Sequence, residues 1–511
     1  MTRVFAIAAL ALTCGYTPPT LAQSSPPDLV KQAITAAGGE QALRGLKSLQ
    51  LVGDVKYWEP DQSLVAGGPA LYLGDSKLTV TRDIANNSAR LVWDRNMLTL
   101  GRMAYTEVVT PNYGFVTDDK GSRPMSSIRV AAQLRELNRL SPTLLLKMKE
   151  NPDRVAFLGG VRTSEGVQPA FSFKDGATTF TVVFSKKTQL PSVIRTQDDD
   201  AIRGTVNYNV RLDDWKPVGG VMVPHQLTYS LNDSAIGRIN FTSATANVPI
   251  DAAQFAPSAE VKAAAKPPAT ENVPYQWVLR RIAMGRFLDS DQVFVATGGS
   301  LKLNELAPNI QHVVGGTHNS LMVNLKDGVL VIDAPINDAQ SRWTIDAAKA
   351  KYGKPVKHLV LTHHHNDHSG GARTYMGEGA AIHVGVPIKK YFVKVALSER
   401  MVPDELQEKR ISPPIEEIKD HATIKDDVTE VRLIRIPNHH ADGMLIAHIM
   451  PANIVWVTDL WSPGGSSTEK TAGVLALSDA LKRNKITDAT IVGGHGGTAP
   501  QSAVEAIVAS K

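Results

Sequence analysis

Two kinds of hydrophobic pattern divide the chain. In the first half, apolar and polar residues alternate in segments such as SKLTVTRD (76–83) and TTFTVVFS (178–185). A period of two predicts strands with one buried face, and the turn residues between segments favour an antiparallel sheet. Residues 27–49, by contrast, have the pattern of two short helices separated by a pair of glycines. Helices followed by many strands predict an α+β, β-rich domain with one curved sheet.

The pattern changes from about residue 297. Strand-like segments over 310–332 give way to a helical segment at 341–353 and then to KHLVL (357–361). A short continuous apolar run is typical of a strand buried on both faces. Strands that alternate with helices predict an α/β layered domain. Residues 387–430 are polar and helix-prone, and we expect them to lie over a site as a wall or lid.

The first residues have the layout of a secretory signal. Arg3 precedes an apolar stretch from Val4 to Leu12, and small residues lead up to Ala22. The stretch is too short for a membrane anchor, and we predict cleavage after Ala22. The mature protein is then periplasmic or secreted, with no integral membrane segment. Lipidation at Cys14 is an alternative, although the preceding residues fit a lipidation site poorly.

An Ala- and Pro-rich stretch separates the two halves. Residues 256–275 have little periodicity and are interpreted as a linker, and QWVLRRIAMGRFL after them can form a docking helix. The predicted segments are a signal peptide (1–22), a β-rich exported domain (23–255), a linker with its docking helix (256–296) and the layered domain (297–511).

Composition mainly excludes functions. The 511 residues carry a net charge of +5, but acidic and basic residues are interspersed, so nothing indicates a nucleic-acid partner. The only cysteine, Cys14, lies in the predicted signal. A metal site in the mature chain must therefore use His, Asp or Glu.

The densest chemical motif is HHHNDHSGG at 363–371. It follows a predicted buried strand, where α/β sheets place their ligands. In an extended loop His363 and His365 point the same way and can converge on one ion, while Asp367 and His368 face a second. The two glycines let the backbone turn sharply beside them. We interpret the motif as a metal cage.

With the preceding threonine, this motif is similar to the signature of the metallo-β-lactamase superfamily, and the resemblance covers about residues 305–500. It implies an αβ/βα four-layer fold for that region. Four further segments resemble family motifs in family order: GVLVIDAP (328–335), HHADGMLIAHI (439–449), NIVWVTDLWSPG (453–464) and IVGGHGG (491–497).

The resemblance also implies the ligands. His440 fits the family spacing for the third histidine, with His439 as the alternative, and His364 is expected to point away. Asp333 would steady the metal loop without binding the ion. Site one would hold His363, His365 and His440, and site two Asp367, His368 and His495, with Asp459 shared between them.

The implied chemistry is metal-assisted hydrolysis with two Zn²⁺, or Fe or Mn instead. A bridging, metal-bound hydroxide would attack a carbonyl, and the catalytic Asp367 would orient it or accept its proton. The substrate would be a small molecule with an ester, lactone, thioester or amide bond. Because the mature chain has no cysteine to replace Asp459, it resembles hydroxyacyl-thioester hydrolases and lactonases more than the lactamases that have one there.

Two other functions stay open. One is a mononuclear-iron oxidoreductase of the same fold, although the second set of ligands argues against it. The other is a ligand-binding protein with a vestigial metal site. The N-terminal half loosely resembles exported lipoprotein-carrier-like β domains around LDDWKPVGGVMVPHQLTYS (212–230). It could serve as a scaffold or hold an apolar or envelope ligand.

Overall fold

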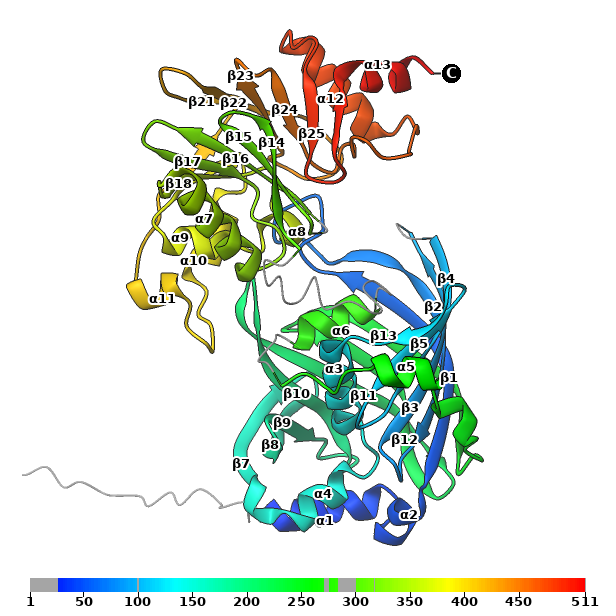
Figure 1. Cartoon of the computed structure of the whole chain (residues 1–511). Helices are drawn as coiled ribbons and strands as arrows, with labels where there is room; N and C mark the ends of the chain where they lie inside the picture. Colours follow the sequence, from blue (N-terminus) through cyan, green and yellow to red (C-terminus); the bar gives the residue numbers. More distant parts are fainter. Residues whose placement is uncertain (1–25, 99–100, 271–274, 284–299, 317, 511) are drawn as a thin grey trace, which may run out of the picture.

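The computed structural model describes residues 26–98, 101–270, 275–283, 300–316 and 318–510. Figure 1 shows two parts, a curved sheet with its helices and a second body formed by the C-terminal residues. The predicted signal peptide lies outside the described residues. Within them, we find no helix with the length and apolar character needed to span a bilayer.

The N-terminal part is one antiparallel sheet of 13 strands, which confirms the predicted β-rich domain. Burial alternates along strands such as β11 and β12, because successive side chains of a strand point to opposite faces. The sheet order is β6-β5-β4-β3-β2-β1-β13-β12-β11-β10-β9-β8-β7. The strands are β1 (Ser48–Glu59), β2 (Leu71–Asp83), β3 (Ser88–Met97), β4 (Gly101–Val109), β5 (Gly114–Asp118), β6 (Gly121–Pro124), β7 (Val155–Thr163), β8 (Gly166–Asp175), β9 (Thr178–Phe184), β10 (Pro191–Asp200), β11 (Gly204–Val218), β12 (Val221–Leu231) and β13 (Ser234–Ala246).

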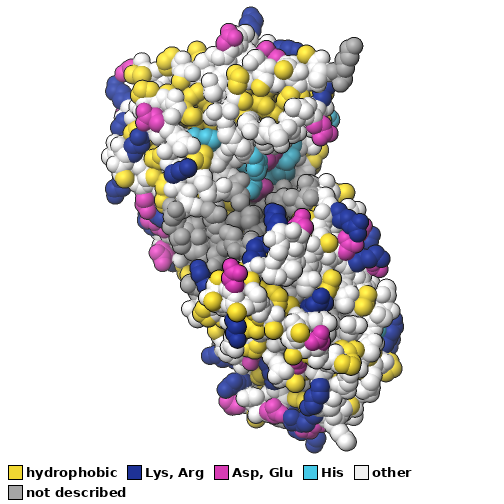
Figure 2. All heavy atoms as spheres, turned by 45° about the vertical axis from the view of Figure 1, so that its right-hand side comes forward, with side chains coloured by type: hydrophobic (Ala, Val, Ile, Leu, Met, Phe, Trp, Pro, Cys, Tyr) yellow, Lys and Arg dark blue, Asp and Glu magenta, His cyan; other side chains and the backbone are white. Residues whose placement is uncertain are grey.

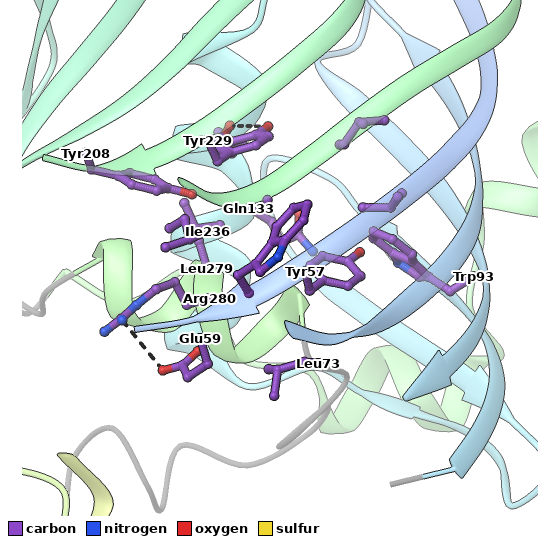
Figure 3. A pocket seen from close by; sticks show the side chains of 15 residues that line it. Tyr57, Glu59, Leu73, Trp93, Gln133, Tyr208, Tyr229, Ile236, Leu279 and Arg280 are labelled. Carbon is purple, nitrogen blue, oxygen red and sulfur yellow. Dashed lines mark hydrogen bonds and ion pairs between the residues drawn. The ribbon is translucent and has the colours of Figure 1, made fainter. Parts of the chain in front are cut away.

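Helices pack against this sheet. Apolar residues of the first helix and of α4 meet strand residues such as Phe171 and Phe173 in the largest N-terminal core cluster. A cavity of about 110 Å³ remains beside Tyr57 and Trp93, with the Arg280–Glu59 ion pair (3.5 Å) at its edge (Figure 3). The helices are α1 (Pro26–Ala36), α2 (Glu40–Gly45), α3 (Ser127–Arg139), α4 (Leu144–Glu150), α5 (Ala259–Ala264) and α6 (Tyr275–Ala283), with short 3-10 turns at Pro152–Arg154 and Ala252–Phe255.

The C-terminal part contains two sheets with short strands. All five residues of β17 and all four of β24 are buried, as expected for strands covered on both faces. The first sheet has the order β14 (Lys302–Ala307), β15 (Ile310–Val314), β16 (Ser320–Leu325), β17 (Gly328–Ile332), β18 (Val356–Leu361), β19 (Ala381–Gly385) and β20 (Ile415–Ile418). The second has the order β21 (His421–Lys425), β22 (Glu430–Arg435), β23 (Leu445–Met450), β24 (Ile454–Val457), β25 (Thr490–Gly493) and β26 (Thr498–Pro500).

One apolar cluster, which includes Leu321, Val360 and Trp456, joins the two sheets. Helices α7, α9 and α10 pack against the first sheet in a second cluster, and α12 and α13 against the second sheet in a third. The helices are α7 (Asp338–Tyr352), α8 (Asn366–Ser369), α9 (Ala372–Gly377), α10 (Lys389–Leu397), α11 (Glu405–Lys409), α12 (Ala472–Arg483) and α13 (Gln501–Ala509).

The prediction that residues 387–430 form a helix-prone insertion is wrong for its second half. Helices α10 and α11 are present, but β20 and β21 follow them. Both are terminal strands of their sheets. Edge strands are short and carry charged residues that discourage further pairing, so their composition looks polar and their period is hard to detect.

Two turns of the N-terminal sheet contact the C-terminal part. At the β10–β11 turn, the Thr205 amide donates to the Glu399 carbonyl (2.6 Å) and the Met401 amide to Asp199 Oδ1 (2.8 Å). The longer β1–β2 loop, residues 60–70, reaches α8 (Figure 1). The C-terminal part therefore meets the N-terminal sheet at turns rather than along a strand.

Candidate metal centre

The metal loop begins where β18 ends at Leu361 and runs through α8 into α9. His363, His365 and His368 are buried within it. The loop turns tightly at Gly370, where a Cβ atom would lie 2.2 Å from the Ile336 carbonyl oxygen. Only glycine lets the chain approach the segment after β17 this closely. The sequence thus folds its histidines into the interior and not into solvent.

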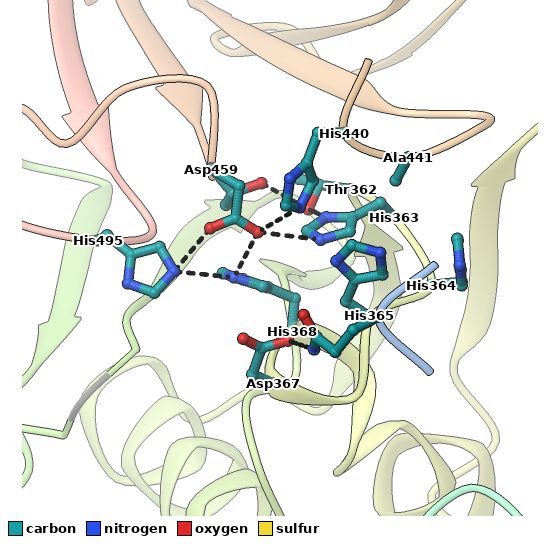
Figure 4. A network of polar contacts seen from close by, with 12 residues as sticks. Thr362, His363, His364, His365, Asp367, His368, His440, Ala441, Asp459 and His495 are labelled. Carbon is teal, nitrogen blue, oxygen red and sulfur yellow. Dashed lines mark hydrogen bonds and ion pairs between the residues drawn. The ribbon is translucent and has the colours of Figure 1, made fainter. Parts of the chain in front are cut away.

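The first ligand group consists of His363, His365, His440 and Asp459, whose potential metal-binding atoms all lie within 4.8 Å of one another. Ring centroids are 4.6 Å apart for His363 and His365 and 4.5 Å apart for His365 and His440. Asp459 Oδ2 lies 3.0 Å from Nε2 of both His363 and His440. Figure 4 shows these side chains converging on one point.

The second group consists of His318, Asp367, His368 and His495. Asp367 Oδ2 lies 3.2 Å from His318 Nε2, and the Nε2 atoms of His368 and His495 are 3.2 Å apart. Asp459 Oδ1 lies 2.7 Å from His495 Nε2 and its Oδ2 lies 3.1 Å from His368 Nε2. Asp459 therefore contacts both groups.

All seven ligands expected from the sequence come together, in the division between two groups that the resemblance implied. His440 is the member of the adjacent pair that joins the first group, and His439 is exposed. His364 points away and shares the Ser63 carbonyl with His365 (Figure 4). That these residues bind metal stays a prediction.

Sequence reasoning missed His318. It follows Gly315 and Gly316 in the connection between β15 and β16, and it is 6% exposed. Its ring centroid lies 4.4 Å from that of His495. The sequence does contain a signal for His318, and it is the same as for His495: a histidine that follows paired glycines at the end of a strand.

Asp333 is completely buried beside the start of the metal loop. Its Oδ1 accepts hydrogen bonds from the Thr362 amide and hydroxyl (both 2.8 Å), and its Oδ2 accepts one from Trp456 Nε1 (3.1 Å). The same Oδ2 lies 3.7 Å from His368 Nδ1. This carboxylate fixes the start of the metal loop and orients one ligand from behind, as outer partners do in metal sites.

Burial favours the neutral form of three imidazoles in the centre. It lowers the pKa of His363 well below the ordinary value, and lowers the pKa of His365 and of His318 to about 4. A neutral imidazole has the lone pair that a cation requires. At neutral pH these three side chains are therefore in the form that can act as ligands.

The carboxylates behave in the complementary way. Although burial opposes ionisation, His368 and the other neighbouring imidazoles hold the pKa of Asp459 well below its ordinary value, and the hydrogen bond from His318 does the same for Asp367. Burial also disfavours protonated His368, but the carboxylate of Asp459 and those of Asp333 and Asp367 raise its pKa well above normal.

Orphaned polar atoms test whether a metal fits. Among the described residues, buried His365 Nδ1 has no hydrogen-bond partner, and buried His363 Nε2 and His440 Nε2 make no well-aligned hydrogen bond although each lies 3.0 Å from Asp459 Oδ2. Leaving such atoms unsatisfied is costly, and a cation at the centre of the first group would satisfy all three. A donor set of imidazole and carboxylate without sulfur suits Zn²⁺, Fe or Mn.

The centre is partly exposed to solvent. The side chains of His440 and His495 are 32% and 27% exposed, whereas that of His363 is fully buried. Figure 2 shows histidines at the surface where the two parts of the molecule meet. A small molecule could approach the two groups from this side.

Comparison with known proteins gives a family match for part of the C-terminal region. Residues 313–449 match the family model described as the metallo-beta-lactamase superfamily. No curated protein matches the chain. Similar solved structures include a metallo-beta-lactamase from Pontibacter korlensis (16% identity, TM-score 0.33, 41% of this chain and 97% of that one) and one from Hirschia baltica (18% identity, TM-score 0.31, 41% and 96%). The family match confirms a metallo-β-lactamase fold in this region.

Proposed function

The C-terminal domain is a member of the metallo-β-lactamase superfamily, and from this premise we propose that the protein is a hydrolase that uses two divalent metal ions. The position of Asp459 carries the proposal. Its two oxygens reach both ligand groups, so one carboxylate can be shared by two neighbouring cations. Zn²⁺ is the expected metal, with Fe or Mn as the alternatives.

The residues of the centre have different proposed roles. When bound, the two cations supply a Lewis acid for the scissile carbonyl and lower the pKa of a shared water. His363, His365 and His440 would hold one of them, and Asp367, His368 and His495 would hold the other, with His318 beside them. Asp367 would also orient the attacking water or accept its proton. Asp333 keeps the metal loop in place.

The proposed reaction is hydrolysis of an ester, lactone, thioester or amide in a small molecule. We also propose that the chain is exported through residues 1–22 to the periplasm or beyond. The N-terminal domain would then act as a scaffold or hold an apolar or envelope ligand. A cavity of about 170 Å³, lined largely by apolar residues such as Leu49, Leu227 and Phe241, supports the second role. Nucleic acid is not an expected partner.

Metal analysis combined with a hydrolysis panel tests the function. The purified chain should contain two zinc ions and should hydrolyse at least one member of a panel of esters, lactones, thioesters and β-lactams. His363→Ala and Asp367→Ala should fold but lose metal-dependent turnover. One iron per chain would favour the oxidoreductase, and a fully loaded but inert protein would favour the ligand-binding function.

A further inference from the structure

The loop between β1 and β2, residues 60–70, touches the centre although it belongs to the other domain. We propose that this loop is a working part of the metal site, in which the Ser63 carbonyl and the Gln62 amide position two of the ligands. The inference rests on the proposed function only in requiring that the two ligand groups hold metal. Neither residue belongs to the matched family region.

Ser63 acts through its backbone. Its carbonyl oxygen lies 3.1 Å from His365 Nε2, so this nitrogen donates and carries the hydrogen. The other ring nitrogen, Nδ1, is the buried atom without a partner among the described residues. A carbonyl that holds one imidazole N–H fixes the tautomer and the ring plane, and leaves the opposite lone pair for the metal. Ser63 is therefore a positioning residue for His365.

Gln62 acts through its side chain. Its Nε2 group has two hydrogens and donates to Asp367 Oδ1 (2.7 Å) and to Asn366 Oδ1 (3.1 Å). Both partners are acceptors, so the amide has only one orientation that satisfies them. The bond occupies one oxygen of Asp367, whereas the other faces His318 in the second group. Gln62 thus selects which carboxylate oxygen is presented to the cation.

The loop is fixed where it leaves β1. Asp61 is buried and has a left-handed backbone with φ 61°. Its carboxylate accepts hydrogen bonds from Arg203 of its own domain (2.9 Å for Nη2 to Oδ1) and from the Tyr391 hydroxyl of α10 (3.1 Å). A strained, buried residue with charged and cross-domain partners is held in one conformation.

The tip is fixed as well. The Leu64 carbonyl accepts from the Asp442 amide (2.7 Å), two residues after the ligand His440. Within the loop, the Val65 carbonyl accepts from the Ser63 hydroxyl (2.8 Å) and from the Gly68 amide (2.9 Å). The loop therefore connects the metal loop and the His440 loop.

Zinc affinity of the full-length chain tests the inference. In Gln62→Met, which keeps the length of the side chain but removes the donor, we expect Zn²⁺ to bind on the order of 10- to 100-fold more weakly, the usual cost of losing an outer partner. Competition with a chromophoric chelator measures this, and the absorption bands of the Co²⁺-loaded protein should shift. The matched control is Gln226→Met, which removes a similar bond from Gln226 Nε2 to Asn240 Oδ1 on an exposed strand pair.

Two further measurements exclude a merely structural effect. The metal-free Gln62→Met protein should fold, with at most a small fall in melting temperature from the two lost hydrogen bonds. A large fall would contradict the inference. Replacing residues 62–66 by five glycines frees the Ser63 carbonyl too, and should weaken binding at least as much. Wild-type zinc affinity and Co²⁺ spectra in both variants would overturn the inference while leaving the hydrolase intact. A wild-type chain that binds no metal would instead refute the proposed function.

Discussion

The two domains use β-strands in opposite ways. Strands β11 and β12 are 15 and 11 residues long and bury alternate side chains, whereas β17 has five residues and buries all of them. In a long strand with alternating burial, one face of the sheet covers the core and the opposite face is more exposed. Short strands between two layers instead bring their ends to a common edge.

The difference shows where chemistry can be placed. Asp333, His363 and Asp459 each come within two residues of the end of a buried strand, β17, β18 or β24. Among the described residues, the N-terminal sheet reaches the centre through the loop between β1 and β2. We therefore expect changes in the C-terminal ligands to affect chemistry, and changes in the N-terminal core to affect stability.

The largest effect is expected for His440→Ala. Loss of one ligand from the first group should remove its cation and reduce hydrolysis to background, because the Lewis acid and the activated water are lost together. Metal content and turnover measure this. His439→Ala is the matched control, since that side chain is exposed. Equal losses in both variants would refute the assignment of His440.

A change in the N-terminal core should affect stability alone. Phe171→Ala removes a fully buried ring and should lower the free energy of unfolding by about 3–5 kcal/mol. Denaturant unfolding measures this, with the exposed Val167→Ala as the control. Zinc affinity of the folded protein should not change, and a parallel loss of affinity would show that the two domains are less separate than their cores suggest.

Asp333→Asn probes the support beneath the ligands. The new amide places a donor toward either the Thr362 or the Trp456 and His368 side of the carboxylate, where donors already lie. We expect zinc affinity to fall by about 10- to 100-fold. The exposed Asp327→Asn is the control. Unchanged affinity would mean that Thr362 keeps its place without this carboxylate.

The smallest effect is expected at the domain contact. Tyr391→Phe removes only the hydroxyl that donates to Asp61, and the loss should be about 0.5–1.5 kcal/mol. Thermal unfolding and the rate of proteolysis in residues 60–70 would detect it. If neither changes, Arg203 alone holds Asp61.

Much of the centre could be predicted because its signals are local. His363, His365, Asp367 and His368 lie in one short stretch. The apolar runs before Asp333 and Asp459 predict the buried strands that position these two residues. Several strands of the N-terminal sheet, such as β2 and β9, were also visible, because their period of two extends over many residues.

The remaining parts have no local signal. His318 follows glycines in a connection that no dense motif marks. Ser63 contributes a carbonyl oxygen, which every residue has, and its partner His365 lies 302 positions later in the chain. Gln62 acquires a role only because the fold brings a hairpin loop to α8. A single sequence does not encode such contacts in its periodicity or spacing.

The large sequence separation between this loop and the metal loop also affects the order of folding. The bond between Gln62 and Asp367 closes a stretch of 305 residues, and pairing residues so far apart carries an entropic cost that local contacts do not. During refolding, secondary structure should therefore recover first, and high-affinity zinc uptake should follow as a slower kinetic phase.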